Sequence, residues 1–463
     1  QGRASARRRS LRRPARYGRM INMSDPVIYE LVSSVGDVMG DTFPEVIDKK
    51  LHIEKIIKSE ELSFNDTLDR GLSHFKKVIK NVSGKKVSGA DAFKLYDTFG
   101  FPLDLTELMA REKGLVVDVK GFDREMNHQK KRAKGSDKFV VDVTNKKWKE
   151  LSKDPDSIFV GYETTTLTSK IVRYVKSDDS FLLVLNQTPF YAEAGGQVGD
   201  KGTIKGSNVD LEVYDVQLEG ETYIHYCRGT MNPKIKNVEC KVDDSRRQRT
   251  RKNHTATHLM HKALKVVLGG HVQQAGSLVH PDYLRFDLTH FEKISSDQIE
   301  RIEKIVNDEI TKNTELDVSV KPYDDAKNEG AVAMFGEKYG DEVRVITVGD
   351  YSKELCGGTH VERTGDIGFF KIIEESSLAS GVRRVVAVTG PESVSYIQNQ
   401  SLTLSDIKSQ LNCSLDSISE RISQLISDKK LLEKKLKNNR KLSSNLNVDS
   451  ILKESQLIKE VTV

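Results

Sequence analysis

Residues 254–258 read His254-Thr-Ala-Thr-His258, and residues 356–360 read Cys356-Gly-Gly-Thr-His360. Histidines four residues apart project from one side of a helix, so both imidazoles can reach a single ion. The second stretch offers a thiolate and an imidazole around two glycines that let the backbone turn tightly. Three imidazoles and one thiolate make a complete tetrahedral Zn²⁺ set. We therefore predict that His254, His258, Cys356 and His360 bind one zinc ion, which ties distant segments of one domain together.

Each half of this pattern also has a simpler interpretation. A histidine pair alone is more often a surface pair or a satisfied core pair, and a free cysteine is commonly a small buried apolar residue. Zinc peptidases share the histidine spacing, but they need a glutamate where this chain has Thr255, so a peptidase is disfavoured. A filled four-ligand shell is typical of a structural site. The sequence leaves open whether zinc is a catalyst or a clamp that positions substrate; we favour the clamp.

A glycine-rich segment upstream, Thr188-Pro-Phe-Tyr-Ala-Glu-Ala-Gly-Gly-Gln197, is a second candidate region. Gly195 and Gly196 would let a backbone or an acyl ester approach closely, and the amide of Gln197 offers both a donor and an acceptor. The alternative is a glycine turn between two strands that leaves Gln197 exposed.

Arginines are concentrated in two places. Residues 1–19 contain eight arginines and no acidic residue, in a chain of formal net charge +5. The second group directly precedes His254. Either group could bind nucleic-acid phosphates, although a solvated charged surface is the common alternative. The candidate contacts are Arg12, Arg13, Arg16, Arg19, Arg246, Arg247, Arg249 and Arg251.

Hydrophobic periodicity divides the chain into four parts. Helical spacing predicts an all-α domain over 1–132, followed by a Lys- and Asp-rich connecting segment over 133–156. Alternating β-rich and helical runs predict one α+β domain over 157–392. Over 393–463, leucines and isoleucines at spacings of three and four predict a coiled coil or helical hairpin that forms homo-oligomers. A single amphipathic helix is an equal alternative there.

Composition limits the cellular setting. The 463 residues are 37% hydrophobic and 30% charged, and no apolar run approaches the roughly 18 residues of a membrane-spanning helix. Four scattered cysteines do not form a disulfide framework, which indicates a reducing compartment. We expect a cytoplasmic protein without membrane contact; the Arg-rich, acid-free start keeps an organellar matrix open.

The combined motifs resemble the alanyl-tRNA synthetase family in collinear order over nearly the whole chain. The zinc pattern alone is shared with free-standing editing proteins and with the threonyl-tRNA synthetase editing domain. The alanyl family is indicated by Arg16-Tyr-Gly-Arg19, Leu95-Tyr-Asp-Thr-Phe-Gly-Phe-Pro-Leu-Asp-Leu105, Phe190-Tyr-Ala-Glu-Ala-Gly-Gly-Gln-Val-Gly-Asp200, Gly276-Ser-Leu-Val279, Leu284-Arg-Phe-Asp287 and Gly381-Val-Arg-Arg384.

This resemblance implies a tRNA-recognition domain, a zinc-containing editing domain and the start of a truncated oligomerisation region. It implies tRNA(Ala) as partner and hydrolysis of mischarged Ser-tRNA(Ala) and Gly-tRNA(Ala). Gln197 and Thr188 would then orient water and sense the serine hydroxyl. We expect the class II aminoacylation domain, which uses ATP and Mg²⁺, to have no counterpart in these residues. The alternatives are a free-standing editing deacylase and a non-catalytic zinc-stabilised RNA-binding module.

Overall fold

The computed structural model describes residues 14–19, 21, 23, 25–80, 82, 84–99, 101–134, 148–177, 180–232, 237–333, 340–379, 381–444, 457–458 and 461–462. The chain divides at Gly390 into a larger unit, Gln1–Gly390, and a smaller unit, Pro391–Val463. None of the helices in the described ranges combines the length and the apolar character needed to span a bilayer.

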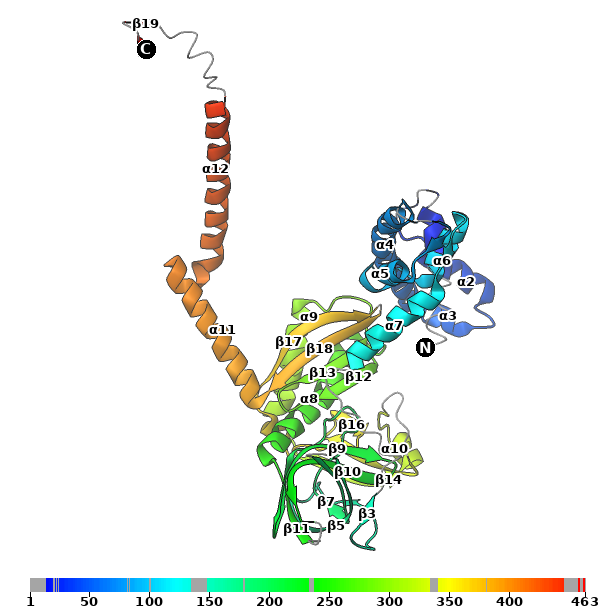
Figure 1. Ribbon diagram of the computed structural model, residues 1–463, viewed down its shortest axis with the longest axis vertical. Helices are drawn as coiled ribbons and strands as arrows, with labels where there is room; N and C mark the ends of the chain where they lie inside the picture. Colours follow the sequence, from blue (N-terminus) through cyan, green and yellow to red (C-terminus); the bar gives the residue numbers. More distant parts are fainter. Residues whose placement is uncertain are drawn as a thin grey trace. The chain divides into compact units, whose positions relative to one another are not determined.

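The first part of the larger unit is mainly helical (Figure 1). Its elements are η1 (Ile28–Glu30), α2 (Leu31–Met39), α3 (Pro44–Asp48), α4 (Lys50–Lys80), α5 (Gly89–Phe99), α6 (Leu103–Glu112) and α7 (Val119–Lys134). Phe64, Leu68, Phe75, Leu95 and Phe101 are buried in its core. The part is not all-α as expected, because β1 (Lys86–Val87) pairs in parallel with β2 (Val116–Val117).

A seven-stranded antiparallel sheet follows and closes on itself. Its strands, in spatial order, are β11 (Asn237–Val242), β8 (Gly202–Gly206), β9 (Val209–Glu219), β10 (Thr222–Met231), β6 (Ser180–Leu185), β5 (Thr166–Ser177) and β3 (Lys149–Glu150). Strand β11 pairs with both β8 and β5, which completes a barrel around its own apolar core. The short strands β4 (Ile158–Phe159) and β7 (Gln187–Thr188) pair separately in parallel. The segment 133–156 was expected to be a connector, but it includes strand β3, which joins this sheet.

Two long helices and two further sheets complete the larger unit (Figure 1). The helices are α8 (Asp244–Leu268) and α9 (Ser296–Thr311). One sheet has the strand order β12 (Gln274–Val279), β13 (Leu284–Thr289), β18 (Val382–Thr389) and β17 (Phe370–Ala379). The other has the order β14 (Leu316–Pro322), β15 (Glu342–Val348) and β16 (Ser352–Leu355). The short helix α10 (Tyr323–Asn328) lies between β14 and β15, and η2 (Thr364–Ile367) lies between β16 and β17. Leu259, Met260, Phe286, Ile302 and Phe370 lie in one core. The expected α+β domain therefore has separate large apolar cores here and in the barrel, together with two smaller clusters around Val184 and Val345.

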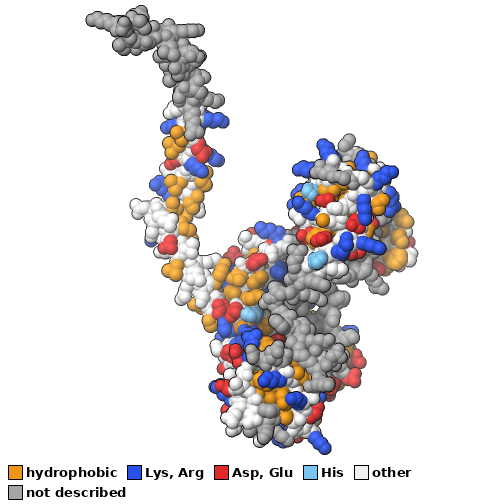
Figure 2. Space-filling view, viewed as in Figure 1, with side chains coloured by type: hydrophobic (Ala, Val, Ile, Leu, Met, Phe, Trp, Pro, Cys, Tyr) orange, Lys and Arg blue, Asp and Glu red, His pale blue; other side chains and the backbone are white. Residues whose placement is uncertain are grey.

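The smaller unit contains α11 (Gly390–Leu411, beginning at the boundary), η3 (Leu415–Ser417), α12 (Ile418–Ser444), and the paired strands β19 (Leu457–Ile458) and β20 (Val461–Thr462). The apolar side chains of α12 lie exposed along the helix (Figure 2). Four of these apolar side chains are between 40% and 60% exposed: Ile422, Leu425, Leu432 and Leu436. No other segment among the described residues covers this apolar side of the helix.

Candidate metal centre

Helix α8 carries the first two candidate ligands. Asp243 begins the helix by accepting a hydrogen bond from the main-chain N–H of Arg246 at 3.0 Å. One turn separates His254 from His258, and both side chains are buried against the core beneath the helix. Their ring centroids are 5.3 Å apart, so the two imidazoles face a common point.

The other two ligands lie on the loop that follows β16. Sγ of Cys356 is 3.3 Å from Nε2 of His254 and 3.3 Å from Nε2 of His360. One ligand atom from each of His254, His258, Cys356 and His360 can be chosen so that all four lie within 4.8 Å of one another. The structure thus brings the two distant pairs together.

The second nitrogen of each imidazole has a partner outside the cluster. Nδ1 of His254 is 2.7 Å from Oε1 of Gln197, and Nδ1 of His360 is 3.1 Å from Oγ1 of Thr255. Nδ1 of His258 is 2.8 Å from Oε2 of Glu354. Metal-bound histidines usually have such partners, which fix the ring and its tautomer. All three rings are thereby set to direct Nε2 toward the centre.

Electrostatics in the cluster favour a thiolate. Burial alone would raise the pKa of the Cys356 thiol, but the surrounding imidazoles lower that pKa well below its ordinary value. Burial lowers the pKa of His360 to about 3. Burial also opposes the charged form of His258, but Glu354 and Cys356 outweigh it and raise its pKa to about 10. A thiolate among three Nε2 atoms is a donor set suited to Zn²⁺, which would supply Lewis acidity or hold a substrate group.

A cavity of about 310 Å³ opens beside these ligands. The side chains and backbone that line it are mostly small or polar. They are those of Tyr191, Ala194, Gly195, His254, Thr257, His258, Gln274, Ser277, Leu355, Cys356, Gly357 and Gly358. A small polar group could enter this space and lie next to the cluster.

Gln197 lies behind His254 and does not line the cavity. Its side chain is fully buried, and Oε1 accepts the main-chain N–H of Thr359 at 2.9 Å in addition to its contact with His254. The alternative of an exposed glutamine is wrong. The expected role of Gln197 in orienting water stays a prediction, which would have to act through its neighbours. Gln197 positions His254. The close approach that Gly196 permits is by the carbonyl of Ser277, which would lie 2.8 Å from an added Cβ.

Thr188 is not part of this site. Its hydroxyl is fully buried, lies 2.7 Å from Nε2 of His225 and accepts the N–H of Phe190 at 3.1 Å. The prediction that Thr188 senses substrate is therefore wrong, because its hydrogen-bonding capacity is used within the barrel.

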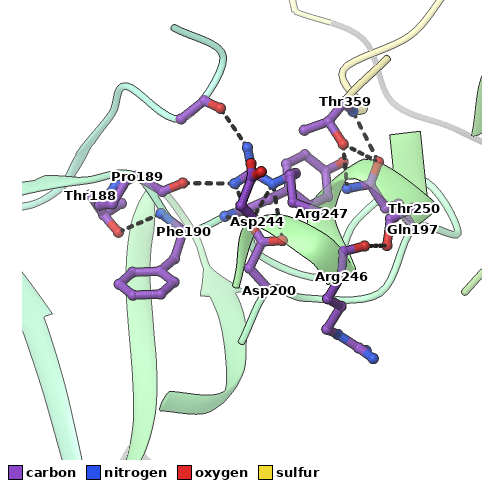
Figure 3. A network of polar contacts seen from close by, with 12 residues as sticks. Thr188, Pro189, Phe190, Gln197, Asp200, Asp244, Arg246, Arg247, Thr250 and Thr359 are labelled. Carbon is purple, nitrogen blue, oxygen red and sulfur yellow. Dashed lines mark hydrogen bonds and ion pairs between the residues drawn. The ribbon is translucent and has the colours of Figure 1, made fainter. Parts of the chain in front are cut away.

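Figure 3 shows the surroundings of Arg247, one of the predicted tRNA contacts. Its guanidinium is fully buried: Nε donates to Asp200 at 2.9 Å, Nη1 to the carbonyl of Gly161 at 2.6 Å and Nη2 to that of Pro189 at 2.8 Å. The prediction for Arg247 is wrong, because the residue fastens α8 to the barrel and cannot reach a phosphate.

The remaining arginines differ in accessibility. Arg246, Arg249 and Arg251 are partly exposed on α8, and Arg249 pairs with Asp282 at 2.8 Å. Arg16 is buried against Glu112, which contradicts its assignment to tRNA binding. Arg19 pairs with Asp69 at 2.9 Å. Arg12 and Arg13 lie outside the described residues. Figure 2 shows many lysines and arginines on the visible face of the helical part.

The sequence interpretation missed several residues of the site. Glu354 stands two positions before Cys356, but nothing local indicated that it would meet His258. Thr257 lies between the two histidines. Ser277 lies in the motif Gly276-Ser-Leu-Val279, which served only to indicate the family, and Gln274 stands two positions before that motif. Their place in the cavity depends on the packing of β12 beside α8.

Two family profiles match the chain. The profile described as tRNA synthetases class II (A) matches residues 1–246, and that described as threonyl and alanyl tRNA synthetase second additional domain matches residues 343–386. The chain is therefore a member of the class II tRNA synthetases, whose profile covers more than half of it. The first match overturns the expectation that the class II domain has no counterpart here.

The similar curated proteins narrow this class. The alanine–tRNA ligase of Legionella pneumophila (strain Paris) is 42% identical over 447 residues, covering 94% of this chain and 51% of the relative. That of Fervidobacterium nodosum is 41% identical over 476 residues, covering 100% and 54%. That of Chlorobaculum tepidum is 43% identical over 462 residues, covering 95% and 52%. The chain belongs to the alanyl-tRNA synthetase family. It spans about half the length of these relatives.

Proposed function

We propose that this protein serves the attachment of alanine to tRNA(Ala), and that its metal centre proofreads the product by hydrolysing Ser-tRNA(Ala) and Gly-tRNA(Ala). The relatives named alanine–tRNA ligase support the first part. ATP and Mg²⁺ belong to that ligation step, and Zn²⁺ to the cluster. A pocket for alanine rejects an analogue with one added hydroxyl only about a hundredfold and cannot exclude glycine by size, so a second, hydrolytic site is needed.

The observation that carries the editing proposal is the cavity beside the four ligand atoms. At about 310 Å³ it accommodates an amino-acid ester, and the hydroxyl of Ser277 and the amide of Gln274 can bond a serine hydroxyl. The hydroxyl of Thr257 donates to the carbonyl of Asn253 at 2.8 Å, so it can only accept a bond from the substrate. The cluster would hold zinc through His254, His258, Cys356 and His360, and three of these residues also line the cavity in which the esterified end of the tRNA would lie.

Cys356→Ala in the full chain tests this proposal with purified Ser-tRNA(Ala). We expect loss of both zinc and deacylation, with the helical content retained by circular dichroism. Cys413→Ala, which removes a thiol between α11 and α12, is the matched control and should keep both properties. Undiminished deacylation by zinc-free Cys356→Ala protein would refute the metal assignment. Tight tRNA binding without any ester cleavage by the unaltered protein would favour the zinc-stabilised RNA-binding module.

The proposed tRNA contact near the site rests on Arg246, Arg249 and Arg251, which are partly exposed on α8. If Arg249 neutralises one phosphate, Arg249→Met should flatten the dependence of log K on log salt by roughly one unit. Arg173→Met, which removes a charge paired with Asp156 in the barrel, is the control. An unchanged slope in Arg249→Met would remove this residue from the interface.

We also propose self-association through α12, because Leu425, Leu432 and Leu436 are at least 44% exposed. Sedimentation analysis of a Leu432→Lys variant should show a lower mass than that of the unaltered chain. Equal masses would refute this contact.

A further inference from the structure

The turn that presents Cys356 is held by an arginine of the neighbouring strand. Arg344 lies in β15, and its main-chain carbonyl accepts the N–H of Cys356 at 2.9 Å. Its side chain then returns to the same turn. Nη1 donates to the carbonyl of Cys356 at 3.1 Å and to the carbonyl of Gly358 at 2.8 Å. One residue thus binds both ends of the turn.

A tyrosine from the barrel binds the middle of the turn. Tyr162 follows strand β4, and its hydroxyl donates to the carbonyl of Gly357 at 2.5 Å. Its ring lies 4.2 Å from the guanidinium carbon of Arg344, which is within the range of a cation–π contact. Three consecutive carbonyls, those of residues 356–358, are therefore engaged by two side chains that also stack on each other.

The position of the thiol depends on this turn. Strand β16 ends at Leu355, so Cys356 has left the regular ladder when its side chain reaches the cluster. Its Sγ is 3.3 Å from Nε2 of both His254 and His360, and it also accepts the N–H of Gly358 at 3.4 Å. A guanidinium is permanently charged and presents donors in a fixed plane, which suits it to fixing two carbonyls in a loop.

We propose that Arg344 and Tyr162 are positioning residues that hold the Cys356 thiolate in the metal centre and tie this loop to the barrel. The proposal rests on the proposed metal centre but not on the editing reaction. Neither side chain provides a ligand atom, so their contribution is to the strength and geometry of metal binding.

The test compares Arg344→Met, Arg344→Lys and Tyr162→Phe in the full chain. Partners of metal ligands typically contribute 10- to 100-fold to affinity, so we expect roughly that loss of zinc affinity in Arg344→Met, measured against a chromophoric chelator. Tyr162→Phe should lose less, and Arg344→Lys should recover part of the loss. With Co²⁺ in place of zinc, the sulfur-to-metal absorption of Arg344→Met should weaken or shift.

Arg173→Met is the matched control, because Arg173, like Arg344, lies against an aromatic ring: its guanidinium carbon is 5.2 Å from the ring of Trp148. Arg173 also pairs with Asp156 and contacts none of the candidate ligands. This variant should bind both ions normally. Wild-type zinc affinity and an unchanged Co²⁺ spectrum in Arg344→Met would overturn the positioning role while leaving the metal centre intact. If the unaltered protein binds neither ion, the metal centre itself fails and the positioning role fails with it. Should Arg344→Met not fold, Tyr162→Phe decides by the same two measurements.

Discussion

Oε2 of Glu354 lies 2.8 Å from Nδ1 of His258, and both side chains are buried. The other oxygen, Oε1, lies 3.4 Å from Nδ1 of His261. Burial alone would raise the pKa of the Glu354 carboxyl, but the two histidines hold that pKa well below its ordinary range. An ionised carboxylate behind a metal-binding imidazole fixes the ring and increases its basicity.

Glu354→Gln should therefore weaken zinc binding about tenfold, because the amide keeps the volume and one acceptor but removes the charge. Competition with a chelator of known affinity measures the change. Glu329→Gln is the control, since Glu329 pairs with Lys321 and Lys353 away from the cluster ligands. Equal affinities for Glu354→Gln and the unaltered protein would show that Glu354 does not support His258.

The two glycines of the metal-binding loop should respond differently to substitution. A Cβ on Gly358 would lie 1.9 Å from Cε1 of His254, whereas a Cβ on Gly357 would meet only the Tyr162 hydroxyl at 4.0 Å. Gly358→Ala should displace His254 and abolish stoichiometric zinc binding, as measured by elemental analysis. Gly357→Ala should bind zinc normally. Normal zinc content in Gly358→Ala would contradict the close packing found here.

Replacement of the buried Arg247 should destabilise the protein far more than replacement of the partly exposed Arg249. Removing the buried Arg247 leaves the carboxylate of Asp200 without its cationic partner, so Arg247→Met should lower the free energy of unfolding by about 3–5 kcal/mol. Arg249→Met breaks a partly exposed pair and should cost about 0–1 kcal/mol. Urea denaturation measures both. Adding Asp200→Asn to Arg247→Met should restore part of the loss; similar values for the two single variants would refute the distinction.

His225 should make the barrel sensitive to acid. Burial lowers the pKa of His225 from its ordinary value of 6.5 to about 4. Below pH 6.5 the unfolded chain binds a proton that the folded barrel does not, so this stabilisation is present above 6.5 and is lost as the pH falls toward 4. Between pH 7 and pH 5 the loss amounts to about 2 kcal/mol.

The pH effect can be isolated with His225→Gln. This variant should be less stable at pH 7, but its free energy of unfolding should fall less between pH 7 and pH 5 than that of the unaltered protein. Urea titrations at the two pH values give the difference. Parallel declines in the two proteins would show that His225 does not cause the acid sensitivity.

The residues of the candidate metal centre could be identified from the sequence because their evidence is local: a spacing of four on a helix and a Cys–Gly–Gly–Thr–His loop. The structure brings these four side chains together, and zinc binding stays a prediction. The predicted role of Arg247 failed for a reason that the sequence already contained. It precedes His254 by two helical turns and therefore shares the buried side of α8. The charge of Arg247 suggested contact with solvent or with a phosphate. Helix periodicity instead puts its guanidinium on the buried side of α8, together with His254.

Long-range pairing accounts for most of what the sequence did not indicate. The continuous apolar run Phe181–Leu185 is typical of a strand, but nothing in it indicates that β11 returns to β5 and closes the barrel. The contacts of Glu354 with His258 and of Tyr162 with Gly357 could not be predicted either, because each joins residues from two elements that are far apart in the sequence. Hydrophobic spacing carries no information about such partners.

The closure of the barrel through β11 also affects where the imidazoles of α8 are placed. Val238, Cys240 and Val242 point inward, alternating with exposed residues, and the strand is bonded on both flanks. A slip by one position would turn all three outward. Since α8 starts only two residues after this strand, the barrel also fixes where the helix starts and hence where His254 stands. The placement of the candidate ligands therefore depends on the alignment of a strand that contributes none of them.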